Sequence, residues 1–276
     1  MLQVNLDSLK FSFSFFINCF QNTCVPFKVH LKFPTILILS KQRRTTMSDQ
    51  MIFKRYEMKY LLSRAQYLQI TEAFDGRMKP DIHGKSTILS LYFDTPDDLL
   101  IRRSLEKPLY KEKLRVRSYG IADTDTTVFV ELKKKYQSVV YKRRIAMSEE
   151  EARRYLLSHA SVMDTQISRE IDYCLSHYRN LIPRMLLSYD RAAFYAMDNP
   201  QFRITFDENI LWRDHDITLT TSIGGTPVLP ADTILMEVKT ADAIPLWLVQ
   251  LLSREKIYKT SFSKYGTAWL QKQRRF

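Results

Sequence analysis

The chain has 276 residues, 45% of them hydrophobic, which is enough to bury one core in a single domain or in a domain plus a tail. Its 42 Lys and Arg against 30 Asp and Glu give a net charge of +12, which favours polyanionic ligands such as nucleic acid, anionic lipid or polyphosphate. The three cysteines and five histidines form neither a CxxC pair nor a metal-ligand spacing, which argues for a reducing compartment and against a zinc site.

The first 46 residues differ from the rest of the chain because they are rich in Phe and lack a clean period. Their apolar run at 11–20 is too short to span a bilayer, and no small-residue cleavage site follows it. We expect Met47 to be the natural start and residues 1–46 to be an upstream extension. Anchoring at a membrane or an interface is the alternative. The functional domain is then predicted over 47–276.

From residue 51 onwards the pattern predicts strands with interspersed helices. Strands are expected at 53–62, 86–93, 111–119, 127–136, 139–147, 184–194, 201–206 and 234–240. One helix is expected to begin at a capping box at Ser63 and to end at about residue 74. Further helices are expected at 97–105, 148–159, 167–179 and 246–252, and a final helix is expected after a polar loop at 262–266. Residues 208–233 are expected to form an irregular connection with one or two short strands. Strands outnumber helices without strict alternation, which predicts an α+β fold with a mostly antiparallel sheet.

Charged residues recur at a spacing of two in these strands, which puts each set on one face. The sets are Arg55/Glu57/Lys59, Arg115/Arg117, Glu131/Lys133/Lys135, Lys142/Arg144, Arg203/Asp207 and Glu237/Lys239. The residues between them are apolar, for example Leu114 and Val116. One wet face is ordinary in an antiparallel sheet, but six such strands predict a charged concave surface or lumen whose matching ligand is a chain of phosphates.

Three patterns could carry chemistry. Two guanidiniums on one face, at Arg115 and Arg117, can bind phosphate oxygens in a bidentate way, although they could also be solvated surface arginines. Glu131-Leu-Lys133 and Glu237-Val-Lys239 each place a carboxylate beside an ammonium, which suits either a divalent cation with phosphate or a structural salt bridge. The chain lacks the Walker and GxGxxG patterns and has only six glycines, so side chains would have to bind the phosphates.

An ordered set of motifs supports a more specific hypothesis. The set is Arg55-Tyr-Glu-Met-Lys59-Tyr, Leu91-Tyr-Phe-Asp-Thr95, Lys113-Leu-Arg-Val-Arg117, Phe129-Val-Glu-Leu-Lys133, Ser188-Tyr-Asp-Arg191, Arg203-Ile-Thr-Phe-Asp207, Met236-Glu-Val-Lys239 and Phe262-Ser-Lys264-Tyr. Over about residues 51–272 it resembles the VTC domain, the polyphosphate polymerase domain of the vacuolar transporter chaperone family, within the triphosphate tunnel metalloenzymes. Each motif is weak alone, and the ordered set is specific.

The resemblance implies an antiparallel β-barrel tunnel with flanking helices and inward-pointing basic side chains. It also implies transfer of the ATP γ-phosphate onto inorganic polyphosphate with Mn²⁺ or Mg²⁺. The implied catalytic residues are Lys59, Arg115, Arg117, Lys133 and Lys264. The implied phosphate-binding residues are Arg55, Arg191, Arg203 and Lys239. The implied metal ligands are Glu237, Glu131 and Glu57.

Two departures from the family pattern keep alternatives open. Arg55 stands where hydrolases of the superfamily carry the first glutamate of Glu-x-Glu-x-Lys, which disfavours a simple triphosphatase. The chain also lacks the SPX domain and transmembrane region of the eukaryotic complexes, so a translocated product would need a separate membrane protein as partner. A tunnel triphosphatase and a non-catalytic polyphosphate-binding module remain the alternatives. We expect a cytoplasmic protein that binds ATP and polyphosphate and no specific nucleic acid.

Overall fold

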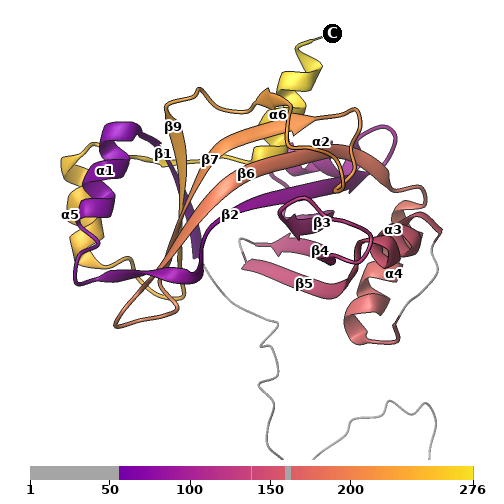
Figure 1. Cartoon of the computed structure of the whole chain (residues 1–276), viewed down its shortest axis with the longest axis horizontal. Coiled ribbons are helices and arrows are strands. Elements are labelled where there is room, and N and C mark those ends of the chain that lie inside the picture. The colour runs from indigo at the N-terminus through magenta and orange to yellow at the C-terminus, as the bar shows by residue number, and fades with distance from the viewer. Residues whose placement is uncertain (1–55, 138, 159–162, 276) are drawn as a thin grey trace, which may run out of the picture. The chain divides into compact units, whose positions relative to one another are not determined.

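The computed structural model describes residues 56–137, 139–158 and 163–275 (Figure 1). The predicted extension 1–46 and the predicted phosphate-binding residue Arg55 lie outside the described residues. The described residues all belong to one unit, Asp49–Phe276.

The sheet accounts for most of the fold. In chain order its strands are β1 (Tyr56–Ser63), β2 (Met78–Asp94), β3 (Tyr110–Tyr119), β4 (Thr127–Tyr136), β5 (Val139–Ser148), β6 (Ile182–Ala196), β7 (Arg203–Arg213), β8 (Thr226–Pro227), β9 (Thr233–Thr240) and β10 (Lys259–Thr260). They pair in the order β10-β1-β9-β7-β6-β2-β3-β4-β5, with β8 beside β7. Every pairing among the described strands is antiparallel, which confirms the predicted fold class.

The helices are short and lie outside the curved sheet (Figure 1). They are α1 (Arg64–Glu72), α2 (Leu99–Leu105), α3 (Glu149–Ser158), α4 (Gln166–Tyr178), α5 (Leu246–Arg254) and α6 (Lys264–Gln273). The predicted capping box is present at α1, where Ser63 Oγ accepts from the Gln66 backbone and the Gln66 side chain accepts from the Ser63 backbone. This cap satisfies orphan amides of the first helical turn and explains why α1 begins where the sequence predicts.

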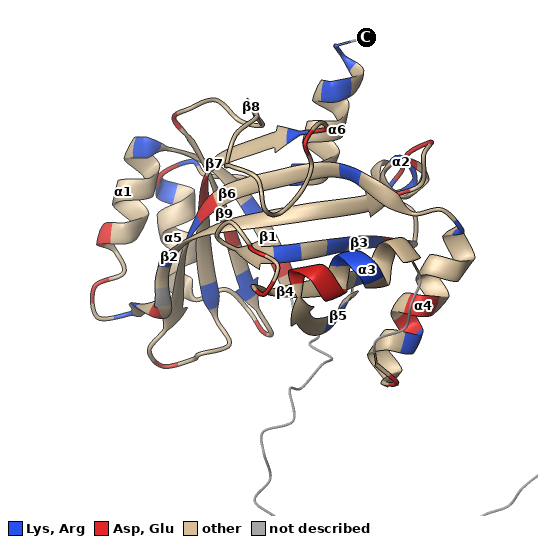
Figure 2. Cartoon of the chain, turned by 45° about the vertical axis from the view of Figure 1, so that its right-hand side comes forward, with Lys and Arg blue, Asp and Glu red and all other residues tan. Residues whose placement is uncertain are grey.

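The apolar core lies between the outer face of the sheet and the helices. Helices α3 and α4 pack on β3–β5 through Leu156 and Ile171, while α1 and α5 pack on β1, β7 and β9 through Ile70 and Leu248. A third cluster joins α2 and α6 to β6 and β7 around Ile101. Since the helices cover the outer face, the inner face remains for the charged residues (Figure 2).

Three local expectations were wrong. Residues 208–213, expected to be irregular, continue β7, because Asn209 adopts φ +51° in a β-bulge and lets the strand resume with Trp212 buried. Strand β2 begins at Met78 rather than at 86, with a register shift before Lys85. Lys264, expected in a polar loop, is the first residue of α6, whose N-cap is Ser263.

The sheet curls around a central cavity without a continuous ladder. Among the described residues, β5 at one end of the hydrogen-bonded order does not pair with β10 or β1 at the other. An ion pair crosses between these ends instead, with Lys133 Nζ on β4 lying 3.5 Å from Glu57 Oε2 on β1.

Candidate functional site

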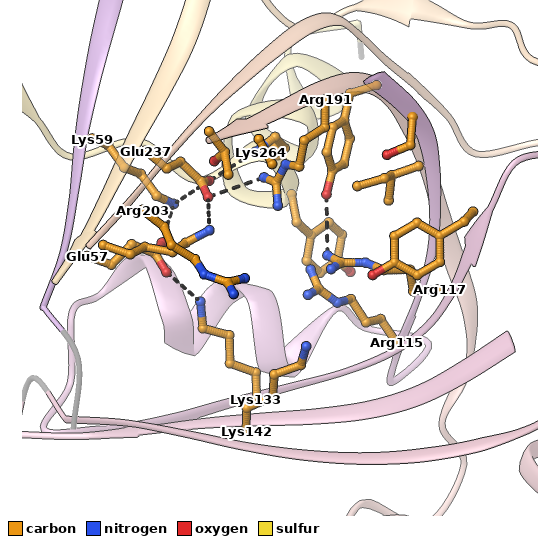
Figure 3. Close-up of a pocket in the computed structure, with 18 of the residues that line it drawn as sticks. Glu57, Lys59, Arg115, Arg117, Lys133, Lys142, Arg191, Arg203, Glu237 and Lys264 are labelled. Carbon is orange, nitrogen blue, oxygen red and sulfur yellow. Dashed lines mark hydrogen bonds and ion pairs between the residues drawn. The ribbon is translucent and has the colours of Figure 1, made fainter. Parts of the chain in front are cut away.

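The curved sheet and the start of α6 enclose a cavity of about 420 Å³ (Figure 3). Three of the residues that line it are acidic, namely Glu57, Asp81 and Glu237. Ten are basic, namely Lys59, Lys113, Arg115, Arg117, Lys133, Lys142, Arg191, Arg203, Lys239 and Lys264. This excess of positive charge in a confined space suits a ligand with several negative charges.

Strand alternation explains how these side chains reach the cavity. On β3, Arg115 and Arg117 point inward, whereas Leu114 and Val116 are buried in the core on the opposite face. The same period of two applies on the other strands, so the predicted concave charged face is confirmed.

Glu237 on β9 is surrounded by cations. Its Oε1 lies 3.1 Å from Lys264 Nζ and 3.7 Å from Lys59 Nζ, and its Oε2 lies 3.1 Å from Lys239 Nζ and 3.2 Å from Arg191 Nη2. Burial alone would raise the pKa of Glu237, but these cations outweigh it and hold the pKa well below its ordinary value. Glu237 is therefore ionised and fixes the positions of four cations.

Asp207 on β7 lies behind the same cations and was not predicted as a site residue. It accepts two hydrogen bonds from Arg191, at 2.6 and 2.7 Å, and lies 2.5 Å from Lys264 Nζ. Burial would lower the pKa of Lys264, but Asp207 and Glu237 outweigh it and raise that pKa above its ordinary value. Lys264 is thus a permanently charged group at the start of α6.

Glu57 on β1 lies beside this cluster. Its Oε1 is 3.2 Å from Lys59 Nζ, and its Oε2 is 3.5 Å from Lys133 Nζ (Figure 3). Burial would raise the pKa of Glu57, but the nearby lysines, of which Lys133 has the largest effect, hold that pKa well below its ordinary value. Because Lys59 contacts both Glu57 and Glu237, these two predicted metal ligands lie close together.

Glu131 on β4 forms a separate cluster and is only 1% exposed. Its Oε2 accepts from Arg115 at 2.7 and 2.9 Å and lies 4.0 Å from Arg117 Nη1. Its Oε1 lies 2.8 Å from both Lys142 Nζ and Arg144 Nε. Burial would raise the pKa of Glu131, but the four cations hold it well below its ordinary value. The contacts of Glu131 are therefore with cations of β3 and β5.

Lys113 on β3 differs from the other basic residues of the cavity. Among the described residues no carboxylate lies at ion-pair distance from it, and its Nζ donates to Ser263 Oγ at 3.1 Å. Burial, followed by Lys133 and Lys59, lowers the pKa of Lys113 to about 7. Lys113 shares the period of two with Arg115 and Arg117, and that signal could have identified it from the sequence.

Two tyrosines help to orient the arginines, and neither was predicted. Arg117 Nη2 donates to Tyr189 Oη at 3.3 Å, and Arg115 Nη1 donates to Tyr92 Oη at 2.9 Å. Burial would raise the pKa of Tyr189, but the nearby cations, Arg117 first, outweigh it and lower that pKa. The sequence indicated only that Tyr189 shares a face with Arg191.

The predicted catalytic residues Lys59, Arg115, Arg117, Lys133 and Lys264 all line the cavity. The predicted phosphate-binding residues Arg191, Arg203 and Lys239 also line the cavity. The side chain of Arg203 is 47% exposed and lies 3.9 Å from Asp81. Among the predicted metal ligands, Glu57 and Glu237 come together while Glu131 joins the other cluster.

The carboxylates offer limited metal ligation. No group of three or more His, Cys, Asp or Glu residues suited to a metal ion occurs in the part of the chain that the structure describes. Mg²⁺ and Mn²⁺ commonly take one or two carboxylates and complete their coordination with water and substrate phosphates. Glu57 and Glu237 fit that kind of site, in which phosphate oxygens complete the coordination.

Comparisons with known proteins identify the family. A family model described as the VTC domain matches residues 54–271. Because this match covers most of the sequence, the chain belongs to the VTC domain family, as the ordered motifs predicted. No curated protein sequence matches the chain.

Several solved structures are distantly similar. A proposed adenylate cyclase from Bacillus halodurans is 15% identical with a TM-score of 0.49, over 78% of this chain and 96% of that chain. A proposed adenylyl cyclase from Hippeastrum, described as having a dominant triphosphatase activity, is 16% identical with a TM-score of 0.45, over 76% and 92% of the two chains. A protein from Pyrococcus horikoshii is 12% identical with a TM-score of 0.40, over 79% and 99%. These similarities are too distant to carry an activity to this chain.

No helix within the described residues is both long and apolar enough to cross a membrane.

Proposed function

We propose that this protein is a metal-dependent polyphosphate polymerase, which transfers the γ-phosphate of ATP onto a growing inorganic polyphosphate chain. The observation that carries the proposal is the cavity itself, in which ten cations from seven strands and a helix face one another in a VTC domain. A cytoplasmic location fits the low cysteine content.

The chain's own residues would act mainly by positioning and charge neutralisation. Phosphoryl transfer needs the attacking and leaving oxygens in line, with the developing charge stabilised, and little covalent help from the protein. The guanidiniums of Arg115, Arg117 and Arg191 are held in fixed orientations by carboxylates and tyrosines, so they would bind phosphate oxygens with little reorganisation. The acceptor is already a phosphate anion, so the reaction requires no strong general base.

A divalent cation held by Glu57 and Glu237 would neutralise phosphate charge and polarise the transferred group. Lys59 lies between these two carboxylates and would remain within reach of the same phosphates. Lys264, charged and held by Asp207, would contact the phosphates from the helical side of the cavity.

Two other functions remain as outcomes of the test. A tunnel triphosphatase would use the same cations but transfer the phosphoryl group to water. A binding module would hold polyphosphate without turnover. Arg55 supports the polymerase over the hydrolase, since hydrolases of the superfamily that this chain resembles carry an additional glutamate at that position.

The test uses the full chain with ATP and Mn²⁺, beside the variants Glu237→Gln and Glu208→Gln. Glu208 is the matched control, because it is paired with Arg64 at 3.0 Å and is not among the residues that line the cavity. Products are resolved on a gel stained for polyphosphate, and free phosphate is measured in parallel.

A polyphosphate ladder from the wild type and from Glu208→Gln, absent from Glu237→Gln, is the expected result. Free phosphate without a ladder would identify a hydrolase. Tight polyphosphate binding without either product would identify a binding module.

A further inference from the structure

Lysines face one another directly on the inner side of β3, β4 and β5. In the strand register Lys111 lies opposite Lys135, Lys113 opposite Lys133, and Lys133 opposite Lys142. We call these five residues the lysine ladder. Directly opposed residues of an antiparallel pair have Cβ atoms about 5 Å apart, and like charges at that distance are destabilising.

The carboxylates of this region do not compensate the whole ladder. Lys142 pairs with Glu131 at 2.8 Å and Lys133 with Glu57 at 3.5 Å. Among the described residues, Lys111, Lys113 and Lys135 have no carboxylate at ion-pair distance. Lys111 Nζ donates instead to the Ser104 backbone carbonyl at 3.0 Å.

The outer face of the same strand provides a contrast. Lys134, the residue between Lys133 and Lys135, points away from the cavity and pairs with Glu170 of α4 at 3.1 Å. The fold thus supplies a carboxylate for a lysine on the outer face and leaves Lys111 and Lys135 on the inner face without one. The inner pair is therefore left to interact with an anion that the protein itself does not supply.

Lys111 and Lys135 lie outside the cavity, on the same strands as two lysines that line it. Lys113 and Lys133 line the cavity, whereas Lys111 and Lys135 lie one alternation further along the same strands. Two residues of a strand span about 6.6 Å, so this pair extends the cationic surface past the cavity towards the start of β3 and the end of β4.

We propose that Lys111 and Lys135 form an external track for long polyphosphate chains, and that the chain leaves the cavity at this end of β3 and β4. The proposal rests on the function proposed above and adds a site beyond the reacting phosphates. A short phosphate ligand would fill the cavity without reaching this pair, whereas a long chain would contact it.

The test compares Lys111→Gln/Lys135→Gln with the wild type and with the control Lys134→Gln. Calorimetry measures the affinity of each protein for tripolyphosphate, ATP and long-chain polyphosphate at one fixed salt concentration. The double variant should bind long-chain polyphosphate roughly tenfold more weakly, which corresponds to two partly exposed ionic contacts. Its affinities for tripolyphosphate and ATP should not change, and the salt dependence of long-chain binding should become shallower.

Each other outcome overturns the proposal in a distinct way. Unchanged long-chain affinity in the double variant refutes the track while leaving the polymerase intact. An equal loss for long and short ligands, or an equal loss in Lys134→Gln, assigns the effect to the fold or to general surface charge. Weakened ATP binding alone assigns the pair to the nucleotide. A wild-type protein that binds no polyphosphate of any length overturns the proposed function as well.

Discussion

The pH dependence of phosphate binding tests the electrostatics of the cavity through a single residue, Lys113. Burial is the largest cause that lowers its pKa to about 7, and the neighbouring cations Lys133 and Lys59 contribute next. A bound chain of phosphates favours the protonated amine. Binding and protonation of Lys113 are therefore linked, and the affinity must depend on pH.

The size of the effect follows from the pKa. An amine with a pKa of about 7 is roughly 90% protonated at about pH 6 and roughly 10% protonated at about pH 8. If the ligand restores the pKa of Lys113 to its ordinary value near 10.4, affinity falls by about tenfold between these two pH values. The sign is fixed by charge, because affinity is greatest below the pKa of the free protein and decreases as pH rises through it.

Two variants bracket the wild type in this measurement. Lys113→Arg keeps a cation that does not titrate in this range, and Lys113→Met removes the charge but keeps an unbranched side chain. Tripolyphosphate affinity is measured by calorimetry for all three proteins at both pH values. The wild type should match Lys113→Arg at the lower pH and bind about tenfold more weakly than Lys113→Arg at the higher pH, while still binding more tightly than Lys113→Met because the amine takes up a proton on binding.

Titration of the ligand's own phosphates affects all three proteins alike, so the difference between their slopes isolates Lys113. Parallel pH profiles for the wild type and Lys113→Arg would refute the reasoning. In that case Lys113 is protonated at both pH values, and burial and the neighbouring cations lower its pKa less than the geometry indicates.

Three further substitutions test the fold around the site. Glu131→Gln should lower the free energy of unfolding by about 3 kcal/mol in urea titrations, because it leaves four clustered cations without their buried counter-charge. An unchanged urea midpoint would contradict the clustering. Gly225→Ala should cost about 2–4 kcal/mol in the same assay, since a Cβ would lie 2.3 Å from the Trp212 carbonyl oxygen at φ +139°. Tyr265→Phe should cost only about 1 kcal/mol, because it loses the 3.0 Å hydrogen bond to Asp94 and keeps its ring contacts. A thermal melt showing a much larger loss would count against that assignment.

Strand periodicity made much of this fold and cavity predictable. Alternation along a strand is a local property, so Arg115 could be assigned to the same face as Arg117, and Lys133 to the same face as Glu131, from their spacing alone. The same rule covers Lys113 and Lys142, although neither was among the predicted site residues. Their place in the cavity required no information beyond the sequence.

The ion pairs of the cavity could not be predicted from strand alternation. Glu131 collects cations from β3 and β5, and Glu237 collects them from β1, β6, β9 and α6, so each cluster depends on which strands are neighbours. The extension of β7 was missed for a related reason. Asn209 adopts a positive φ in a bulge whose partner strand lies outside its local sequence.

The break in strand pairing between β5 and β10 bears on how a polymer gets in and out. A ladder closed by backbone hydrogen bonds admits a chain only by threading from one end. Here the described strands meet across a side-chain contact, Lys133 with Glu57, and that contact can exchange for a phosphate without breaking any backbone hydrogen bond. The two edges of the sheet could therefore separate slightly as a chain of phosphates enters or leaves the cavity, at the expense of one ion pair rather than of a strand pairing.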